Sequence, residues 1–320
     1  MFSANNPIMP ALDAPLTFRP LFFERVWGGR KLASHYRKDI PAERHIGESW
    51  EIVDRPEAQS MVESGALSGR SLHDLWVNYR ADIFGEVNDR PRFPLLIKLL
   101  DCREKLSLQV HPPAPVAAAL KGEPKSECWY IADATPEAEL YLGFSQPASP
   151  NGFRQAISDG TAAELIHRIP VGRGDAFFIP SGRIHAIGAG NLIVEVQQNS
   201  DTTFRVFDWN RCDKDGKPRE LHIEEALSCI DFEDSRPAAL EASGETILAH
   251  ELFTIERWAL LDSRPLVAPG EFSIAFCLSG TIRCAGMLFY PGNFFLMPAG
   301  MTDRLVEPGA AGTKLLRITL

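Results

Sequence analysis

His185 stands at the end of a turn whose residue types are those of a metal-ligating corner. Residues 174–185 read G-D-A-F-F-I-P-S-G-R-I-H, a G-x5-P-x-G-x2-H spacing that places one histidine just past a tight connection. His111 ends the run L-S-L-Q-V-H, and Glu127 lies between the two histidines in the chain. Together with Gln109 these side chains offer the mixed nitrogen and oxygen donors that a divalent first-row metal prefers. The four residues predict a metal site.

The run that contains His111 has the period of a β-strand. Alternation over residues 106–111 places Ser107, Gln109 and His111 on one face and three apolar residues on the other. The donors therefore share a polar face, with a core face behind it. The turn before His185 could by itself be an ordinary Gly/Pro hairpin corner, but the shared face and Glu127 favour a metal site.

Two charged residues interrupt apolar runs that are typical of strands. Lys98 lies in L-L-I-K-L-L, where a lysine either reaches solvent along its aliphatic stem or is buried for function. Glu195 lies in L-I-V-E-V-Q, where it either points into a polar interior or faces solvent on a half-buried strand. A partly desolvated carboxylate has a raised pKa and can carry a proton near pH 7.

The composition argues against several classes of partner. The chain has 320 residues, of which 45% are hydrophobic, and a formal net charge of -9. That length suggests two or three domains. The negative charge argues against nucleic acid or an anionic membrane as the main partner. It does not exclude a small anionic molecule as the ligand, because such a ligand needs only a few lysines and arginines in one pocket.

The chain reads as a cytoplasmic protein with reduced thiols. Its six cysteines form no C-x-x-C pair, and a chain of this length needs no disulfide. Cys277 and Cys284 could face each other across a hairpin, but we expect no disulfide there. The N-terminal residues do not resemble a secretory signal, and no apolar run approaches the roughly 18 residues of a membrane span.

Short apolar strands separated by Gly, Pro, Asn and Asp predict a mainly β protein. Helical spacing is confined to a few segments, and we expect helices over residues 71–84, 113–120, 161–168 and 223–229. The run over 272–290 predicts two strands joined at Ser279 and Gly280.

The turn before His185 has a second copy. Residues 292–303 repeat the G-x5-P-x-G-x2 pattern 118 positions further on, with Asp303 in the place of the histidine. Repeated short strands with such corners fit the double-sheet jelly roll of cupins. We expect a bicupin of two jelly-roll β-barrel modules: a metal-binding catalytic domain over 1–235 and a metal-free domain over 236–320, with a linker within 233–245.

Longer strings of the sequence resemble one family, the type I mannose-6-phosphate isomerases in their short bacterial form. The strings are W-G-G-R-K-L (27–32), I-G-E-S-W-E (46–51), F-P-L-L-I-K-L-L (93–100), L-S-L-Q-V-H-P (106–112), K-S-E-C-W-Y (125–130) and Q-N-S-D-T-T-F-R-V-F-D-W (198–209). The resemblance implies a bicupin aldose–ketose isomerase with one zinc ion per chain, which interconverts mannose 6-phosphate and fructose 6-phosphate.

The resemblance also implies roles for individual residues. The family's zinc ligands fall on Gln109, His111, Glu127 and His185, with a set of three that omits Gln109 as the alternative for the short form. Its active-site arginine falls on Arg205, its acid–base carboxylate on Glu195, and the lysines near its sugar on Lys98 and Lys125. Only 57 residues separate Glu127 from His185, too few for the helical insertion of the longer forms.

The chemistry implied by the family accounts for the polar residues. Isomerisation through an enediol needs a Lewis acid for the developing negative oxygen and a group that moves a proton between adjacent carbons. A sugar phosphate also needs a charged cradle, for which Ser107 and Lys125 are our candidates. Arg205 would contact the reacting oxygens, with Asp201 orienting its guanidinium. The alternative role of Arg205 is an ion pair with Asp201 or Asp208.

Two other functions would share part of this pattern. A cupin oxygenase using iron(II) would have a similar histidine and carboxylate set, but it has no evident need for Lys98, Lys125 and Arg205. A sugar-phosphate-binding cupin without turnover would need no proton carrier, and Glu195 is present. We therefore expect a zinc-dependent isomerase.

Overall fold

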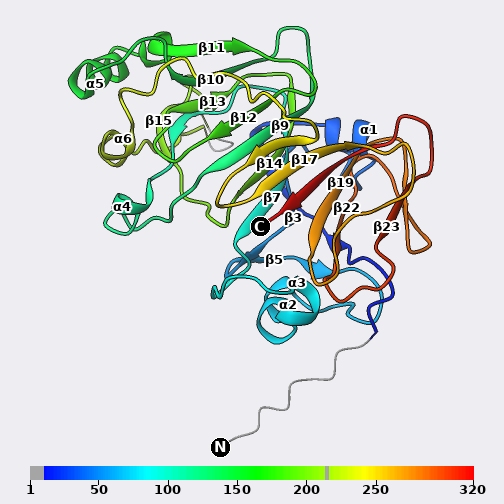
Figure 1. Cartoon of the computed structure of the whole chain (residues 1–320). Helices are drawn as coiled ribbons and strands as arrows, with labels where there is room; N and C mark the ends of the chain where they lie inside the picture. Colours follow the sequence, from blue (N-terminus) through cyan, green and yellow to red (C-terminus); the bar gives the residue numbers. More distant parts are fainter. Residues whose placement is uncertain (1–10, 213–215) are drawn as a thin grey trace, which may run out of the picture.

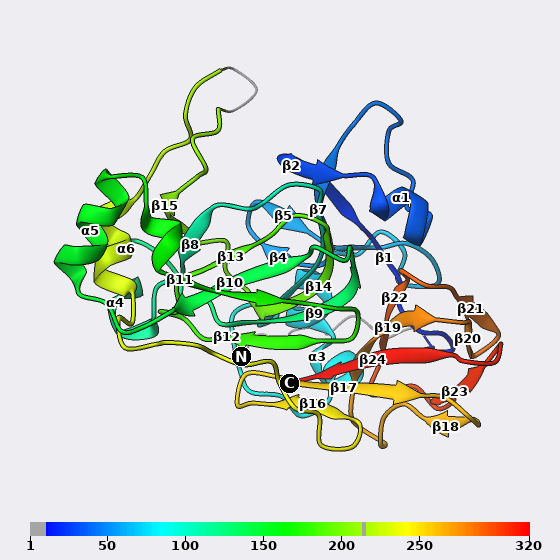
Figure 2. The ribbon, with the colours of Figure 1, turned by 90° about the horizontal axis from the view of Figure 1, so that it is seen from above.

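The computed structural model describes residues 11–212 and 216–320, and it consists mainly of β-strands in two double-sheet modules (Figures 1 and 2). The first module has a six-stranded sheet in the order β12 (Ala176–Ile179), β9 (Glu127–Ala134), β14 (Asn191–Gln198), β7 (Leu95–Cys102), β2 (Leu21–Gly29) and β3 (Ile46–Ile52). Its second sheet has the order β11 (Ile166–Pro170), β10 (Glu139–Phe144), β13 (His185–Ile187), β8 (Leu108–Val110) and β15 (Phe204–Phe207).

The second module repeats this plan with fewer strands. One sheet has the order β16 (Thr246–Ala249), β17 (Thr254–Ala259), β24 (Lys314–Thr319), β19 (Ser273–Ser279) and β22 (Phe294–Met297). The other has the order β18 (Arg264–Pro265), β23 (Leu305–Pro308), β20 (Ile282–Cys284) and β21 (Met287–Phe289). These sheets confirm the predicted mainly β, bicupin architecture. The predicted domain boundary between residues 235 and 236 falls between α6 (Ile223–Cys229) and β16. We keep this boundary as a proposal.

Two short sheets and the remaining helices complete the described chain. The short sheets pair β1 (Phe18–Arg19) with β6 (Met61–Val62), and β4 (Asp54–Arg55) with β5 (Ala58–Gln59). The remaining helices are α1 (Lys31–Tyr36), α2 (Leu72–Asn78), α3 (Arg80–Phe84), α4 (Ala114–Ala117), α5 (Pro150–Ser158) and the 3-10 turn η1 (Ala162–Leu165). Helices α4, α5 and α6 gather at the end of the first module that lies away from the second (Figure 2). None of the described helices is long and apolar enough to cross a membrane.

The predicted helices are confirmed in part. The segment 223–229 is helical over its predicted length, whereas 71–84 divides at Tyr79 into α2 and α3, and 113–120 contains only the four residues of α4. The Ser71 hydroxyl accepts a hydrogen bond from the Asp74 amide at 3.0 Å and caps α2. The helix predicted over 161–168 is wrong, because η1 ends at Leu165 and the following residues pair with β10 as β11.

The two strands predicted to join at Ser279 and Gly280 are present as β19 and β20, but they do not pair with each other. Strand β19 pairs with β22 and β24, whereas β20 pairs with β21 and β23 in the opposite sheet. The chain therefore crosses between the sheets at this point. All six cysteines are free, as expected.

Strand β7 is buried on both faces, and this decides where Lys98 points. Its odd-numbered residues, such as Ile97 and Leu99, belong to the largest apolar cluster, which also contains Ile274 and Leu316 of the second module. The even-numbered residues face the interior of the first module. One apolar cluster thus packs the two modules together, and Lys98 is directed into the barrel of the first.

The internal repeat of the sequence appears as a repeat of structure. Strand β22 lies 118 positions after β12, at the same place in the repeated motif. The interior of the second module is filled by apolar side chains, among them Trp258, Phe289, Phe295 and Met297. Asp303, in the place of His185, is exposed and accepts a hydrogen bond from the Leu305 amide at 3.3 Å.

Candidate metal centre and active site

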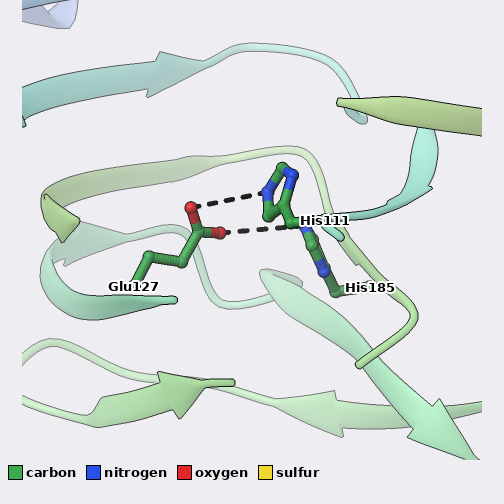
Figure 3. Close-up of side chains that lie close together, drawn as sticks. All are labelled: His111, Glu127 and His185. Carbon is green, nitrogen blue, oxygen red and sulfur yellow. Dashed lines mark ion pairs between the residues drawn. The ribbon is translucent and has the colours of Figure 1, made fainter. Parts of the chain in front are cut away.

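His111, Glu127 and His185 converge in the interior of the first module (Figure 3). His111 follows β8, His185 begins β13, and Glu127 begins β9 of the opposite sheet, so both sheets contribute. The Nε2 atom of His111 lies 3.5 Å from Glu127 Oε2, and that of His185 lies 3.7 Å from Glu127 Oε1. The three candidate ligand atoms lie within 4.8 Å of one another, and all three side chains are buried.

Backbone carbonyls fix the orientation of both imidazoles. The Nδ1 atom of His111 lies 2.8 Å from the Thr202 carbonyl oxygen, and Nδ1 of His185 lies 2.8 Å from that of Arg183. A ring that donates its Nδ1–H to a carbonyl presents the lone pair of Nε2 to the other side, here toward Glu127. Burial, and then the Lys125 ammonium, lower the pKa of His111, while burial and His111 lower the pKa of His185 to about 3. Both rings are therefore neutral, as metal ligands must be.

Glu127 offers two buried oxygens to this centre. Neither oxygen accepts a well-directed hydrogen bond within the described residues. Oε2 forms an ion pair with Lys125, whose Nζ lies 2.8 Å away. Burial by itself would raise the pKa of Glu127, but the Lys125 ammonium opposes this effect, and the pKa of Glu127 lies well below its usual range. An ionised carboxylate with free lone pairs beside two neutral imidazoles suits a divalent metal such as zinc.

Gln109 lies at the edge of the same centre. It is paired across the strands with His185 on one side and Arg205 on the other. Its Nε2 lies 3.3 Å from His185 Nε2, and its Oε1 accepts a hydrogen bond from the Ser107 hydroxyl at 3.1 Å. The shared polar face predicted for the run 106–111 is thus present, although Gln109 turns its oxygen toward Ser107.

A cavity of about 390 Å³ opens beside the metal-ligand cluster. It is lined by Arg25, Trp27, Glu48, Lys98, Leu100, Leu106, Ser107, Gln109, Lys125, Glu195, Asp201, Thr203, Arg205 and Arg219. The structure therefore gathers every residue proposed from the sequence at this cavity or at the ligand cluster. Its wall is rich in charge of both signs, which suits a small polar anion better than an apolar ligand.

Lys98 and Glu195 form a buried ion pair in this wall. They are directly paired across β7 and β14, and Lys98 Nζ lies 3.4 Å from Glu195 Oε2. The Trp129 indole N–H donates to Glu195 Oε1 at 3.0 Å. Burial, and then the charge of Glu127, raise the pKa of Glu195. Of the two orientations left open by the sequence for each residue, the structure shows the interior one.

Arg205 has different neighbours from those expected. Its Nε donates to the Ser107 hydroxyl at 3.2 Å and its NH1 to the Glu220 carbonyl at 2.9 Å. Asp201, expected to orient this guanidinium, instead lies 3.9 Å from Lys98 Nζ. Asp208 pairs with Arg211 and Arg219 rather than with Arg205. Asp201 precedes β15 and lies beside Lys98 of β7, whereas Arg205, within β15, reaches Ser107 next to β8.

Three charged residues of the cavity wall were not predicted from the sequence: Arg25, Glu48 and Arg219. Arg25 and Glu48 form an ion pair at 2.7 Å, on strands β2 and β3 far from the ligand strings. The string I-G-E-S-W-E, with Glu48 two residues before Trp50, offered a signal for one of them. Arg219 lies in the segment after β15, and no pattern in the sequence around it indicates a site.

A pair of histidines and a carboxylate between the two sheets of a β-barrel, open to a charged cavity, defines the metal-ligating type of cupin module. The model of the family described as phosphomannose isomerase type I, catalytic domain, matches residues 16–156, which include His111 and Glu127. The chain is 37% identical over 306 residues to mannose-6-phosphate isomerase ManA of Bacillus subtilis (strain 168). The matched region covers 92% of this chain and 96% of that relative. The chain belongs to the type I mannose-6-phosphate isomerase family.

Solved structures agree with this membership. The crystal structure of the mannose 6-phosphate isomerase from Bacillus subtilis matches with a TM-score of 0.85 at 32% identity, over 96% of this chain and 99% of that chain. A zinc-bound mannose 6-phosphate isomerase matches with a TM-score of 0.75 at 17% identity, over 95% and 98% of the two chains, a likeness that shows the shared fold.

Proposed function

We propose that this protein is a zinc-dependent aldose–ketose isomerase that interconverts mannose 6-phosphate and fructose 6-phosphate through an enediol. The observation that carries the proposal is a buried His–Glu–His cluster with neutral imidazoles beside a cavity that holds Glu195. Relatives named mannose-6-phosphate isomerase, and a zinc-bound structure of the same fold, support it. The six free cysteines agree with the cytoplasm as its place of action.

The metal ligands we propose are His111, Glu127 and His185, with Gln109 as a fourth if its amide turns its oxygen inward. When bound, zinc would act as a Lewis acid toward the oxygens of the substrate. The protein's own groups would do the rest. Lys125, whose Nζ lies 2.8 Å from Glu127 and 3.1 Å from His111 Nε2, would donate to sugar oxygens next to the ligand cluster.

Glu195 is the proposed proton carrier. Its carboxylate would take a proton from C2 of the aldose and return it to C1, and a second proton would pass from the oxygen on C2 to the oxygen on C1. Lys98 would hold a hydroxyl of the sugar. A raised pKa makes Glu195 a stronger base in its ionised form and keeps its conjugate acid within reach near neutral pH. Asp201, beside Lys98, would help to orient that ammonium.

The phosphate would lie at the arginine side of the cavity. Arg205, Arg211 and Arg219 are close together, and Asp208 is the carboxylate that pairs with the last two. Three guanidinium groups around one carboxylate leave an excess of positive charge. Burial lowers the pKa of Arg205 most, and the neighbouring Arg219 lowers it further. We place the phosphate between Arg205 and Arg219, both of which line the cavity, with the Ser107 hydroxyl as a further donor.

The proposed function is tested by assaying conversion of mannose 6-phosphate to fructose 6-phosphate before and after chelation. We expect chelation to abolish activity and zinc to restore it, because the metal supplies several kcal/mol of transition-state stabilisation. Iron(II) that supports oxygen consumption instead would favour the oxygenase alternative. Metal-loaded protein that binds the sugar phosphate without converting it would favour a binding protein.

The phosphate site gives a second prediction. Substituting Arg219 by Met is expected to raise the KM for mannose 6-phosphate about tenfold or more with little change in kcat, because a charge-assisted contact distant from the reacting carbons is lost. Asp208 retains Arg211 as a partner. Arg154→Met removes an exposed arginine that pairs with Glu224 and serves as the matched control. Equal KM values for the two variants would place the phosphate elsewhere.

A further inference from the structure

Four side chains form one row across the sheet beside the cavity, and the middle two, Lys98 and Glu195, line it. Trp50 on β3 is paired with Lys98 on β7, Lys98 with Glu195 on β14, and Glu195 with Trp129 on β9. Directly paired residues of antiparallel strands point to the same face of the sheet. A Lys–Glu pair is therefore flanked on each side by a tryptophan, and Lys98 Nζ lies 5.0 Å from the centre of the Trp50 ring.

Glu48 joins this row from β3. It precedes Trp50 by two residues and so shares its face of the strand. Its Oε2 accepts a hydrogen bond from the Trp50 indole N–H at 2.8 Å, and its Oε1 accepts one from Arg25 Nε at 2.7 Å. Both oxygens are thus held by donors, which fixes the orientation of the carboxylate. Lys98 and Arg25 lower the pKa of Glu48 to about 2 against the effect of burial, so it stays ionised.

Lys98 consequently lies near three carboxylates, which differ in their exposure to water. Its Nζ is 3.4 Å from Glu195 Oε2, 3.9 Å from Asp201 Oδ1 and 4.0 Å from Glu48 Oε2. The Asp201 side chain is 48% exposed, whereas that of Glu48 is 13% exposed and that of Glu195 is 5% exposed. Screening by water weakens the pull of Asp201, so Glu48 is the main fixed negative charge that draws the ammonium away from Glu195.

We propose that Glu48 is a positioning residue for the isomerase: its fixed carboxylate shares the Lys98 ammonium and thereby leaves Glu195 free to exchange a proton with the substrate. The proposal rests on the proposed function, because it concerns the same proton transfer. Glu48 itself need not touch the reacting carbons. It would act through Lys98, and its loss would be felt at Glu195.

The expected effect on pH dependence has a definite sign. The charged groups that line the same cavity as Glu195 are Arg25, Glu48, Lys98, Lys125, Asp201, Arg205 and Arg219, and the adjoining ligand cluster adds His111, Glu127 and His185. Removing the negative charge of Glu48 removes a like charge and lets Lys98 move toward Glu195. Both changes favour the ionised form of Glu195 and lower its pKa. The acid limb of the profile of kcat against pH should therefore move to lower pH.

The test compares Glu48→Gln with Glu51→Gln. Glu51 is a second buried glutamate on β3, paired with Lys38 at 2.7 Å and outside the cavity lining. We expect Glu48→Gln to lower kcat about tenfold, to change KM less than twofold, and to move the acid limb downward by about one pH unit. We expect Glu51→Gln to leave all three unchanged. Zinc content, measured on both variants, should equal that of the wild type.

Two further variants keep the test decisive. Glu48→Asp retains the charge and should recover most of the lost kcat, and Trp50→Phe removes one donor to Glu48 and should give a smaller change of the same sign. If Glu48→Gln does not fold, the test uses Trp50→Phe, and the position of the acid limb in its profile of kcat against pH decides whether the inference holds. An unmoved acid limb in an active variant overturns the inference alone. A wild-type protein that converts no mannose 6-phosphate overturns the proposed function, and the inference with it.

Discussion

Substituting His185 by asparagine is expected to remove zinc from the protein and to lower kcat at least a thousandfold. His185 supplies one of three convergent donors, and its ring is already neutral and oriented by the Arg183 carbonyl. Asparagine is shorter and cannot place a nitrogen lone pair at the same point. A thousandfold loss corresponds to about 4 kcal/mol, within the several kcal/mol expected from a Lewis acid.

The measurement is zinc content by elemental analysis together with kcat for mannose 6-phosphate. His167→Asn is the matched control, because His167 lies on β11 of the same five-stranded sheet but outside the ligand cluster and the cavity. We expect that control to keep one zinc per chain and full activity. A His185→Asn protein that retains both zinc and turnover would show that this cluster is not the metal centre.

Strand parity explains which parts of this site the sequence could predict. In and beside β8 the polar residues alternate with buried apolar ones, so the local pattern correctly predicted one shared face for Ser107, Gln109 and His111. The same alternation in β14 left open whether Glu195 points into the barrel or to solvent. The repeated Gly and Pro turn likewise identified two related strands 118 positions apart. These features depend on neighbours in the chain.

Features that depend on pairing between distant segments could not be predicted. The helix predicted over 161–168 includes residues 166–168, but their pairing with β10 outweighs the local helical spacing. Likewise the register of β3, β7 and β14 is what brings Glu48 to Lys98 and Glu195, and no local pattern reveals that register. Arg219 reaches the cavity through its ion pair with Asp208, a contact within a segment without regular spacing.

Substituting Glu195 by glutamine should separate proton transfer from binding. The amide has the same shape, can still accept the Trp129 hydrogen bond, and leaves Lys98 with Glu48 and Asp201 as partners. It cannot accept a proton from carbon near neutral pH. We expect kcat to fall about a thousandfold, within the range for loss of a general base, with KM and zinc content little changed.

Exchange of the C2 hydrogen of mannose 6-phosphate with deuterated solvent isolates the step assigned to Glu195. The raised pKa of Glu195 predicts that the wild-type rate declines on acidification at a pH above the usual range of a glutamate, since protonation removes the base. In Glu195→Gln both the exchange and this acid limb should disappear. Asp101→Asn is the matched control: burial also raises the pKa of Asp101, but this carboxylate caps the start of α1, where it accepts a hydrogen bond from the Lys31 amide at 2.5 Å.

The control distinguishes a catalytic carboxylate from a buried one. Asparagine can still accept the Lys31 hydrogen bond, so Asp101→Asn should keep both exchange and the acid limb. If Glu195→Gln kept them as well, the proton would have to be moved by another group of the cavity. Glu48 would then be a poor substitute, because its pKa of about 2 makes it a weak base. The remaining carboxylate of the cavity lining is Asp201, and Asp201→Asn would then be expected to abolish exchange instead.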